Sequence, residues 1–193
     1  MGQYYRPVIE TDENELKAID NYVNGNYQLA KLMEHSWYDN IWVDTISEMI
    51  YLEPHRIAWV GDYADAVIED FPNIPVKELF ETAWGDSKER DKELQNKGFD
   101  LKGKFLVNHT THEYINLDKY KKENKRNGYC THPVPLLTAI GNGQGGGDFY
   151  TYANKEHIED VGKWAWNVLE IVDQIPPSYN KDYKEVMYHF IEE

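Results

Sequence analysis

The chain has a single cysteine, Cys130, among its 193 residues. One cysteine cannot form an intrachain disulfide or a cysteine-based zinc site. The sequence also lacks a run of roughly 18 apolar residues, which a membrane-spanning helix would need, and its N-terminus carries no basic-then-apolar signal segment. These absences predict a soluble protein of a reducing, cytoplasmic compartment with no membrane partner.

Basic residues are scarce: 20 Lys and Arg stand against 34 Asp and Glu, a formal net charge of −14. Nucleic-acid polymers and anionic membranes are bound through basic surfaces, so this balance disfavours both as partners. Nucleophile motifs are missing as well, because no G-x-S-x-G surrounds Ser36 and Cys130 lies in no recognised motif. The missing motifs favour a protein that is not an enzyme and has no cofactor. A homo-oligomer is possible on this composition.

Apolar and aromatic residues are plentiful, at 41% and 14% of the chain, with six Trp and 15 Tyr. A chain of this composition can bury a substantial core, and its length fits one globular domain over 1–193. The grouping of helices with short strands predicts an α+β fold, a mostly antiparallel sheet with two or three packed helices.

Hydrophobic patterning places the individual elements. We expect strands at 3–9, 56–61, 104–109, 113–117 and 164–172. Helices are expected at 11–22, at 41–50 with Asp39 or Asn40 as the cap, and at 76–94. Residues 119–126 are expected to form an exposed polar excursion, and Pro133 and Pro135 to hold the next stretch extended.

The most distinctive segment is Gly-Asn-Gly-Gln-Gly-Gly-Gly-Asp at 141–148, which holds five of the chain's 13 glycines. Glycine lets main-chain N–H groups approach a ligand closely, as anion-cradling loops require. The predicted ligand-binding residues here are Asn142, Gly143, Gly145, Gly146, Gly147 and Asp148. The alternative is an ordinary loop or hairpin bend. A Rossmann loop is rejected, because Asp148 and Phe149 open a strand-like alternation instead of a helix.

A second group of polar residues lies at Asn108-His109-Thr110-Thr111-His112, and His132 follows later in the chain. Imidazoles can bind a metal, transfer protons or donate hydrogen bonds to a phosphate. Asn108, His109 and His132 are therefore predicted to join the ligand-binding site. The alternative is that the histidines have structural roles.

Gly61-Asp62-Tyr63-Ala64-Asp65 follows the expected strand at 56–61. Carboxylates at a strand's carboxyl end can hold a metal, and G-D-x-x-D is similar to the metal-binding turn of metallophosphoesterases. A divalent metal held by Asp62, Asp65 and His109 is thus the cofactor alternative. Otherwise Asp62 caps the following turn through backbone N–H groups.

Several segments together resemble a known group of sequences: MGQYYRPV at 1–8, KLMEHSW at 31–37, WVGDYAD at 59–65, VNHT at 107–110, and HPVPLLTA at 132–139 running into the glycine-rich stretch. They resemble an uncharacterised family of small bacterial, phage and protist proteins. The resemblance spans most of the chain and implies no particular activity.

Three functional hypotheses follow. The first is a soluble, non-catalytic binding protein for a small anionic, nucleotide-like ligand whose phosphate is held by the glycine-rich loop, such as a sequestering protein of phage or bacterial origin. The second is a metal-dependent phosphoester hydrolase. The third is an acidic protein-interaction or immunity module that meets a basic partner.

Overall fold

The computed structural model describes residues 3–10, 16–19, 21–23, 26–64, 80, 98–141, 147–149, 155–179 and 181–191. Its main sheet contains β1 (Tyr5–Glu10), β2 (Leu16–Ala18), β5 (His55–Gly61), β6 (Phe105–Asn108), β7 (Glu113–Asn116), β10 (Ala139–Ile140), β11 (Val168–Val172) and β12 (Lys184–Glu185). Two small hairpins pair β3 (Asn21–Val23) with β4 (Asn26–Gln28) and β8 (Lys125–Arg126) with β9 (Tyr129–Cys130). The helices are α1 (Leu32–His35), α2 (Ile41–Met49), α5 (Leu117–Glu123), α6 (Pro133–Thr138) and α7 (Lys155–Ile158).

The strand order is β12-β7-β6-β11-β5-β1-β2, with β10 added beside β5. Neighbouring strands are mostly antiparallel; the exceptions are β10 beside β5 and β12 beside β7. The predicted α+β class with a mostly antiparallel sheet is confirmed. None of the described helices is long and apolar enough to cross a membrane.

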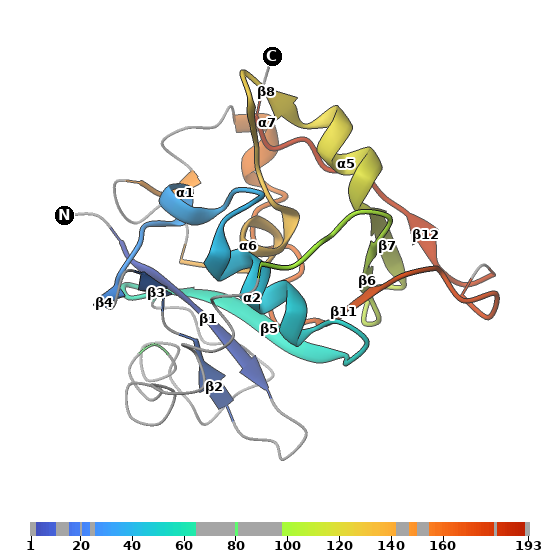
Figure 1. Cartoon of the computed structure of the whole chain (residues 1–193), viewed down its shortest axis with the longest axis horizontal. Coiled ribbons are helices and arrows are strands. Elements are labelled where there is room, and N and C mark those ends of the chain that lie inside the picture. The colour runs from blue at the N-terminus through green and yellow to red at the C-terminus, as the bar shows by residue number, and fades with distance from the viewer. Residues whose placement is uncertain are drawn as a thin grey trace.

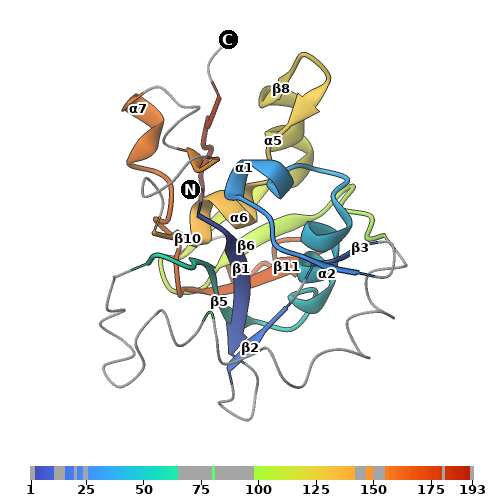
Figure 2. The ribbon, with the colours of Figure 1, turned by 90° about the vertical axis from the view of Figure 1, so that its left-hand side faces the viewer.

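Strand β5 organises the core because its side chains alternate between two apolar layers. Ile57 and Trp59 enter the larger cluster, into which α2 and α6 also pack. Ala58 and Val60 enter a smaller cluster on the opposite face, together with Trp166. Figure 1 shows β1 and β5 side by side beneath α2 and α6, and Figure 2 shows the same two strands after a 90° turn. Both layers of the domain therefore meet at this strand.

The predicted strands at 3–9, 56–61, 104–109 and 113–117 appear as β1, β5, β6 and β7. Helix α2 also forms as predicted, with the Asn40 side chain accepting from the N–H groups of Trp42 and Val43 at 3.0 and 3.3 Å. Trp42, Val43 and Ile46 of this helix are buried, whereas Ile41 is 49% exposed.

Three predicted elements were wrong. The expected helix at 11–22 is replaced in its described part by β2 and β3, because antiparallel pairing of β2 with β1 buries Ala18. Residues 119–126 are no exposed excursion: helix α5 covers most of them and fully buries Tyr120. In addition, β11 begins only at Val168, since Trp166 has a positive φ of 63° within a turn.

The stretch after His132 is helical, which corrects the extended conformation expected from its prolines. Pro133 and Pro135 both lie in the first turn of α6, where the missing N–H groups would have no intrahelical partner in any case. His132 caps this helix by accepting from the Val134 N–H at 3.3 Å. Gly147, Asp148 and Phe149 form no strand. The predicted helix at 76–94 lies outside the described residues except for Phe80.

Candidate functional site at the carboxyl ends of two strands

Three segments that are distant in the sequence meet at one edge of the sheet. Strands β5 and β10 run parallel, with Ala139 opposite Trp59 and Ile140 opposite Val60, so both end at this edge. From there β5 continues into 61–64 and β10 into the glycine-rich stretch at Gly141. Antiparallel β1 begins at the same edge, with Tyr5 opposite Gly61. In open, mostly parallel α/β sheets ligands bind just outside the carboxyl ends of the strands, and in this mostly antiparallel sheet the β5–β10 pair has that arrangement.

The buried side chain of Gln3 connects these segments. In the orientation that satisfies its neighbours, its amide nitrogen donates to the Gly141 carbonyl and to Asp148 Oδ2, the latter at 3.0 Å. The amide oxygen accepts from the Tyr63 N–H at 3.2 Å. One carboxamide therefore joins the start and the end of the glycine-rich stretch to the turn after β5.

Asp148 is a fully buried carboxylate at the end of that stretch. The Tyr5 hydroxyl hydrogen-bonds to it, and Tyr5 Oη also lies 3.1 Å from the Gln3 amide. Burial first, and then the charge of Asp148, raise the pKa of Tyr5 far above its ordinary value. The phenol therefore stays protonated and can serve as a donor to the carboxylate.

Both described ends of the stretch require glycine. Gly141 has φ +94°, and a Cβ there would lie 2.7 Å from the terminal amide group of Gln3 and 2.9 Å from Ala64 Cβ. Gly147 has φ +89°, and a Cβ there would collide with the Lys31 side chain. The Met33 N–H donates to the Gly147 carbonyl at 3.0 Å, which fixes this end against α1.

The other predicted loop residues, Asn142, Gly143, Gly145 and Gly146, lie outside the described residues, as does Asp65. Their roles stay predictions. Asp62 is described and lies at the same edge, where its Oδ1 accepts from the Tyr4 N–H at 3.0 Å and its own N–H donates to the Tyr4 carbonyl at 2.9 Å. These two bonds close the end of the β1–β5 ladder.

Asn108 and His109 lie elsewhere. Asn108 is buried and its Oδ1 accepts from Thr110 and Thr111 N–H groups at 2.9 and 3.1 Å, which forms the β6–β7 turn. The His109 N–H donates to the Val168 carbonyl, and Val168 pairs with Arg56 near the start of β5. At about 3.3 Å per residue, Arg56 is about 16 Å along β5 from Gly61. The structure does not bring His109 to Asp62 or to the described ends of the glycine-rich stretch, Gly141, Gly147 and Asp148.

His132 occupies a third place. It is fully buried, caps α6 and packs against Tyr38 with ring centroids 4.8 Å apart. Burial first, and then the charge of Lys121, lower the pKa of His132 to about 3, so the imidazole is neutral. Its Nε2 has no hydrogen-bond partner among the described atoms. The predicted site residues that the structure describes thus divide among three locations: Gly147 and Asp148 lie at the strand-end site together with Asp62 of the metal alternative, and Asn108, His109 and His132 do not.

Sequence analysis missed Gln3 and Tyr5 as members of this site. A polar residue directly before a buried strand is a weak indication, but Gln3 and Tyr5 belong to the N-terminal segment on which the family resemblance depends. The segments at 31–37, 59–65 and the start of the glycine-rich stretch contribute the other contacts. Residues of the segments at 1–8, 31–37 and 59–65 therefore meet the described ends of the glycine-rich stretch, whereas the segment at 107–110 lies elsewhere.

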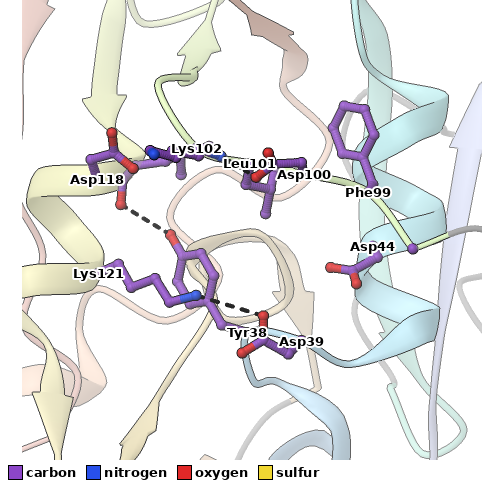
Figure 3. A pocket seen from close by; sticks show the side chains of 11 residues that line it. Tyr38, Asp39, Asp44, Phe99, Asp100, Leu101, Lys102, Asp118 and Lys121 are labelled. Atoms are coloured by element: carbon purple, nitrogen blue, oxygen red, sulfur yellow. Dashed lines mark hydrogen bonds and ion pairs between the residues drawn. The ribbon is translucent and has the colours of Figure 1, made fainter.

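A separate cavity of about 680 Å³ lies between α2, α5 and residues 98–102. Its lining includes four aspartates, Asp39, Asp44, Asp100 and Asp118, and two lysines, Lys102 and Lys121. Figure 3 shows Lys121 reaching Asp39, with Nζ 3.6 Å from Oδ1, past the Tyr38 ring. Burial first, and then the charge of Asp39, raise the pKa of Asp44 to about 6. This charge balance suits a cation better than a phosphate.

No group of three His, Cys, Asp or Glu side chains suited to a metal ion occurs among the described residues. The chain matches no protein-family model, no curated protein and no solved structure.

Proposed function

We propose that this protein is a cytoplasmic, non-catalytic binding protein for a small anionic, nucleotide-like ligand. The phosphate would be held by main-chain N–H groups of the glycine-rich stretch 141–148. The observation that carries the proposal is the Gln3 carboxamide, which ties Gly141 and Asp148 together beside the turn that follows β5. Both ends of the stretch are thereby fixed at the edge where strands β5 and β10 end.

Fixed ends matter because a flexible loop loses conformational entropy when it closes on a ligand. A loop whose termini are already held by buried hydrogen bonds loses less, so more of the gross binding energy remains as affinity. Glycine at each end also allows the backbone to approach Gln3 and Lys31 closely. The arrangement favours a preorganised binding loop over an ordinary surface connection.

The charge of Asp148 opposes an anion nearby, so the proposal depends on its compensation. The Tyr5 hydroxyl and the Gln3 amide both direct hydrogen bonds to this carboxylate. Donor dipoles of this kind reduce the field of a buried carboxylate. The aliphatic part of the Lys31 side chain lies against Gly147, and its ammonium group is 3.9 Å from Glu34 Oε1.

The test is a thermal-shift titration with inorganic phosphate and with mono-, di- and cyclic nucleotides. We expect at least one nucleotide to raise Tm saturably, since a ligand at 100 times its Kd stabilises by about 2.7 kcal/mol. Gly141→Ala should weaken this binding at least tenfold by displacing Gln3 and Ala64. Gly103→Ala is the matched control, because Gly103 also has a positive φ of 72° but nothing lies within 4 Å of an added Cβ. Failure of every nucleotide and of phosphate to shift Tm would overturn the proposal.

A second candidate, the acidic interaction module, is favoured by the cavity between α2 and α5. The cavity is lined by four carboxylates, and the Tyr38 and Phe99 rings in it already hold Lys121 and Lys104 of this chain, with Nζ 4.7 and 5.6 Å from the ring centroids. A guanidinium or ammonium group of a basic partner would take the place of these cations beside the carboxylates. An oligo-arginine peptide serves as the probe. We expect salt-sensitive binding that Asp44→Asn weakens, and equal binding by the wild type and this variant would exclude the cavity.

The metal-dependent hydrolase has less support. Two of its proposed metal ligands, Asp62 and His109, do not lie together. Asp62 accepts a hydrogen bond from the Tyr4 N–H, whereas His109 lies near the start of β5 and is hydrogen-bonded to Glu170.

A further inference from the structure

His109 is part of a chain of three side chains outside the strand-end site. Its Nε2 lies 2.8 Å from Glu170 Oε2, and its Nδ1 lies 2.9 Å from the Tyr183 hydroxyl. His109 and Glu170 are largely buried, with side chains 20% and 13% exposed. Residues from the turn after β6, from β11 and from the C-terminal segment thus form a carboxylate–imidazole–phenol series.

The proton positions in this series follow from its chemistry. An ionised Glu170 can only accept, so in the neutral imidazole the proton lies on His109 Nε2. His109 Nδ1 is then the bare acceptor, and the Tyr183 O–H donates to it. A carboxylate that orients an imidazole, which in turn accepts from a hydroxyl, is the arrangement that activates hydroxyl nucleophiles in enzymes.

The Tyr183 ring is held in place while remaining only partly buried. Tyr179 stacks on it with centroids 4.5 Å apart, and His112 stacks on it at 4.8 Å. Burial first, then Tyr179, Glu170 and Asp182, raise the pKa of Tyr183, so the hydroxyl keeps its proton at neutral pH. Any nucleophilic role of this hydroxyl therefore needs a base, and His109 Nδ1 is in hydrogen-bonding distance.

We propose that Tyr183 is an acyl-accepting residue, with His109 as its base and Glu170 as the residue that positions His109. The Tyr183 oxygen attacks the carbonyl carbon of an activated ester or thioester while its proton passes to His109 Nδ1. A new C–O bond forms, the bond to the alcohol or thiol breaks, and the leaving group takes the proton from the imidazolium. The protein ends as the O-acyl-tyrosine form after a single turnover.

The acyl donor should be uncharged. Glu170 and Asp182 supply negative charge at this place and raise the pKa of Tyr183. The whole chain carries a formal net charge of −14. Coulomb repulsion would therefore disfavour a phosphoester or another anionic electrophile. This site is independent of the glycine-rich stretch and of the proposed binding function.

The test exposes the full-length protein to p-nitrophenyl acetate and measures acetylation of each tyrosine by peptide mass spectrometry. Tyr129 is the internal reference, because it is 68% exposed and so measures unassisted reactivity. We expect Tyr183 to react about 100-fold faster than Tyr129, which is within the usual range of general-base assistance. A stoichiometric burst of nitrophenolate should accompany the modification, and Tyr183→Phe should abolish it.

His109→Gln should reduce the Tyr183 rate to within about threefold of the Tyr129 rate, whereas the control Tyr129→Phe should leave it unchanged. Circular dichroism checks that each variant is folded. If His109→Gln does not fold, Glu170→Gln replaces it, and the Tyr183 rate should fall about tenfold because the carboxylate that contacts His109 Nε2 no longer orients the imidazole. Equal rates for Tyr183 and Tyr129, or a Tyr183 rate that neither variant changes, would overturn the proposal.

Discussion

Replacement of Gln3 by alanine tests the centre of the strand-end site. Gln3→Ala removes the donors to the Gly141 carbonyl and Asp148 Oδ2 and the acceptor for the Tyr63 N–H. Leaving a buried polar group without its partner costs about 1–3 kcal/mol. With at least two such groups affected, we expect the free energy of unfolding to fall by about 3 kcal/mol. For a domain of this size that loss lowers Tm by about 6–12 °C.

Urea titration followed by tryptophan fluorescence measures the change, since Trp42 and Trp59 are buried in the core. Gln3→Glu distinguishes the effect of lost hydrogen bonds from the effect of lost side-chain volume. Glutamate is nearly the same size as glutamine, but it places a negative charge beside Asp148 in place of the N–H group that donates to it. We expect it to be at least as unstable as Gln3→Ala. The control is Gln174→Ala at an exposed position, which should change stability by less than about 0.5 kcal/mol. A Gln3→Ala effect as small as that of Gln174→Ala would refute the network.

Three further predictions concern other buried features. Gly147→Ala should lower the free energy of unfolding more than Gly98→Ala does, as urea unfolding of both variants would show. Both glycines have a positive φ, but of the two only Gly147 has a side chain, that of Lys31, where an added Cβ would lie. Trp59→Phe should lower the unfolding free energy by about 2–4 kcal/mol, since it removes the indole N–H that donates to His35 Nε2 at 2.6 Å and leaves a cavity. The third is pH-dependent. The pKa of His132 is lowered by burial from 6.5 to about 3, so protonation favours the unfolded state and stability is lost as pH falls below 6.5. His132→Asn retains an acceptor for the Val134 N–H and should reduce this loss by about 1.4 kcal/mol per pH unit between pH 6 and 4, measured by urea unfolding at each pH.

Local patterns predicted much of the sheet correctly because their physical basis is local. The apolar run at 56–61 lies between turn residues and forms β5, and the β6–β7 hairpin turns where Asn108 can accept from nearby N–H groups. Asn40 caps α2 through the same short-range chemistry. Where tertiary contacts compete with local preference, prediction failed: pairing with β1 makes β2 a strand, and burial of Tyr120 accompanies helix α5.

The candidate site was predicted only in part. Glycine at 141 and 147 was a sound indication of an unusual backbone, because positive φ is a property of the residue itself. The spacing of Asn108, His109 and His132 in the sequence carried no information about how far their side chains lie from the glycine-rich stretch. In the structure each of these side chains has a different set of hydrogen-bond partners. The role of Gln3 depends on Gly141, Asp148 and Tyr63, which are far from it in the sequence.

By itself the sequence determined the acidic charge, the α+β class, the cap of α2 and the positive φ of the glycines at both described ends of the glycine-rich stretch. These properties depend on composition or on residues within a few positions of one another. Only the tertiary structure decided that Gln3 joins Asp148 and that His109 joins Glu170 and Tyr183. A hydrogen bond needs its two atoms within about 3 Å, and strand pairing between distant segments is what sets that distance.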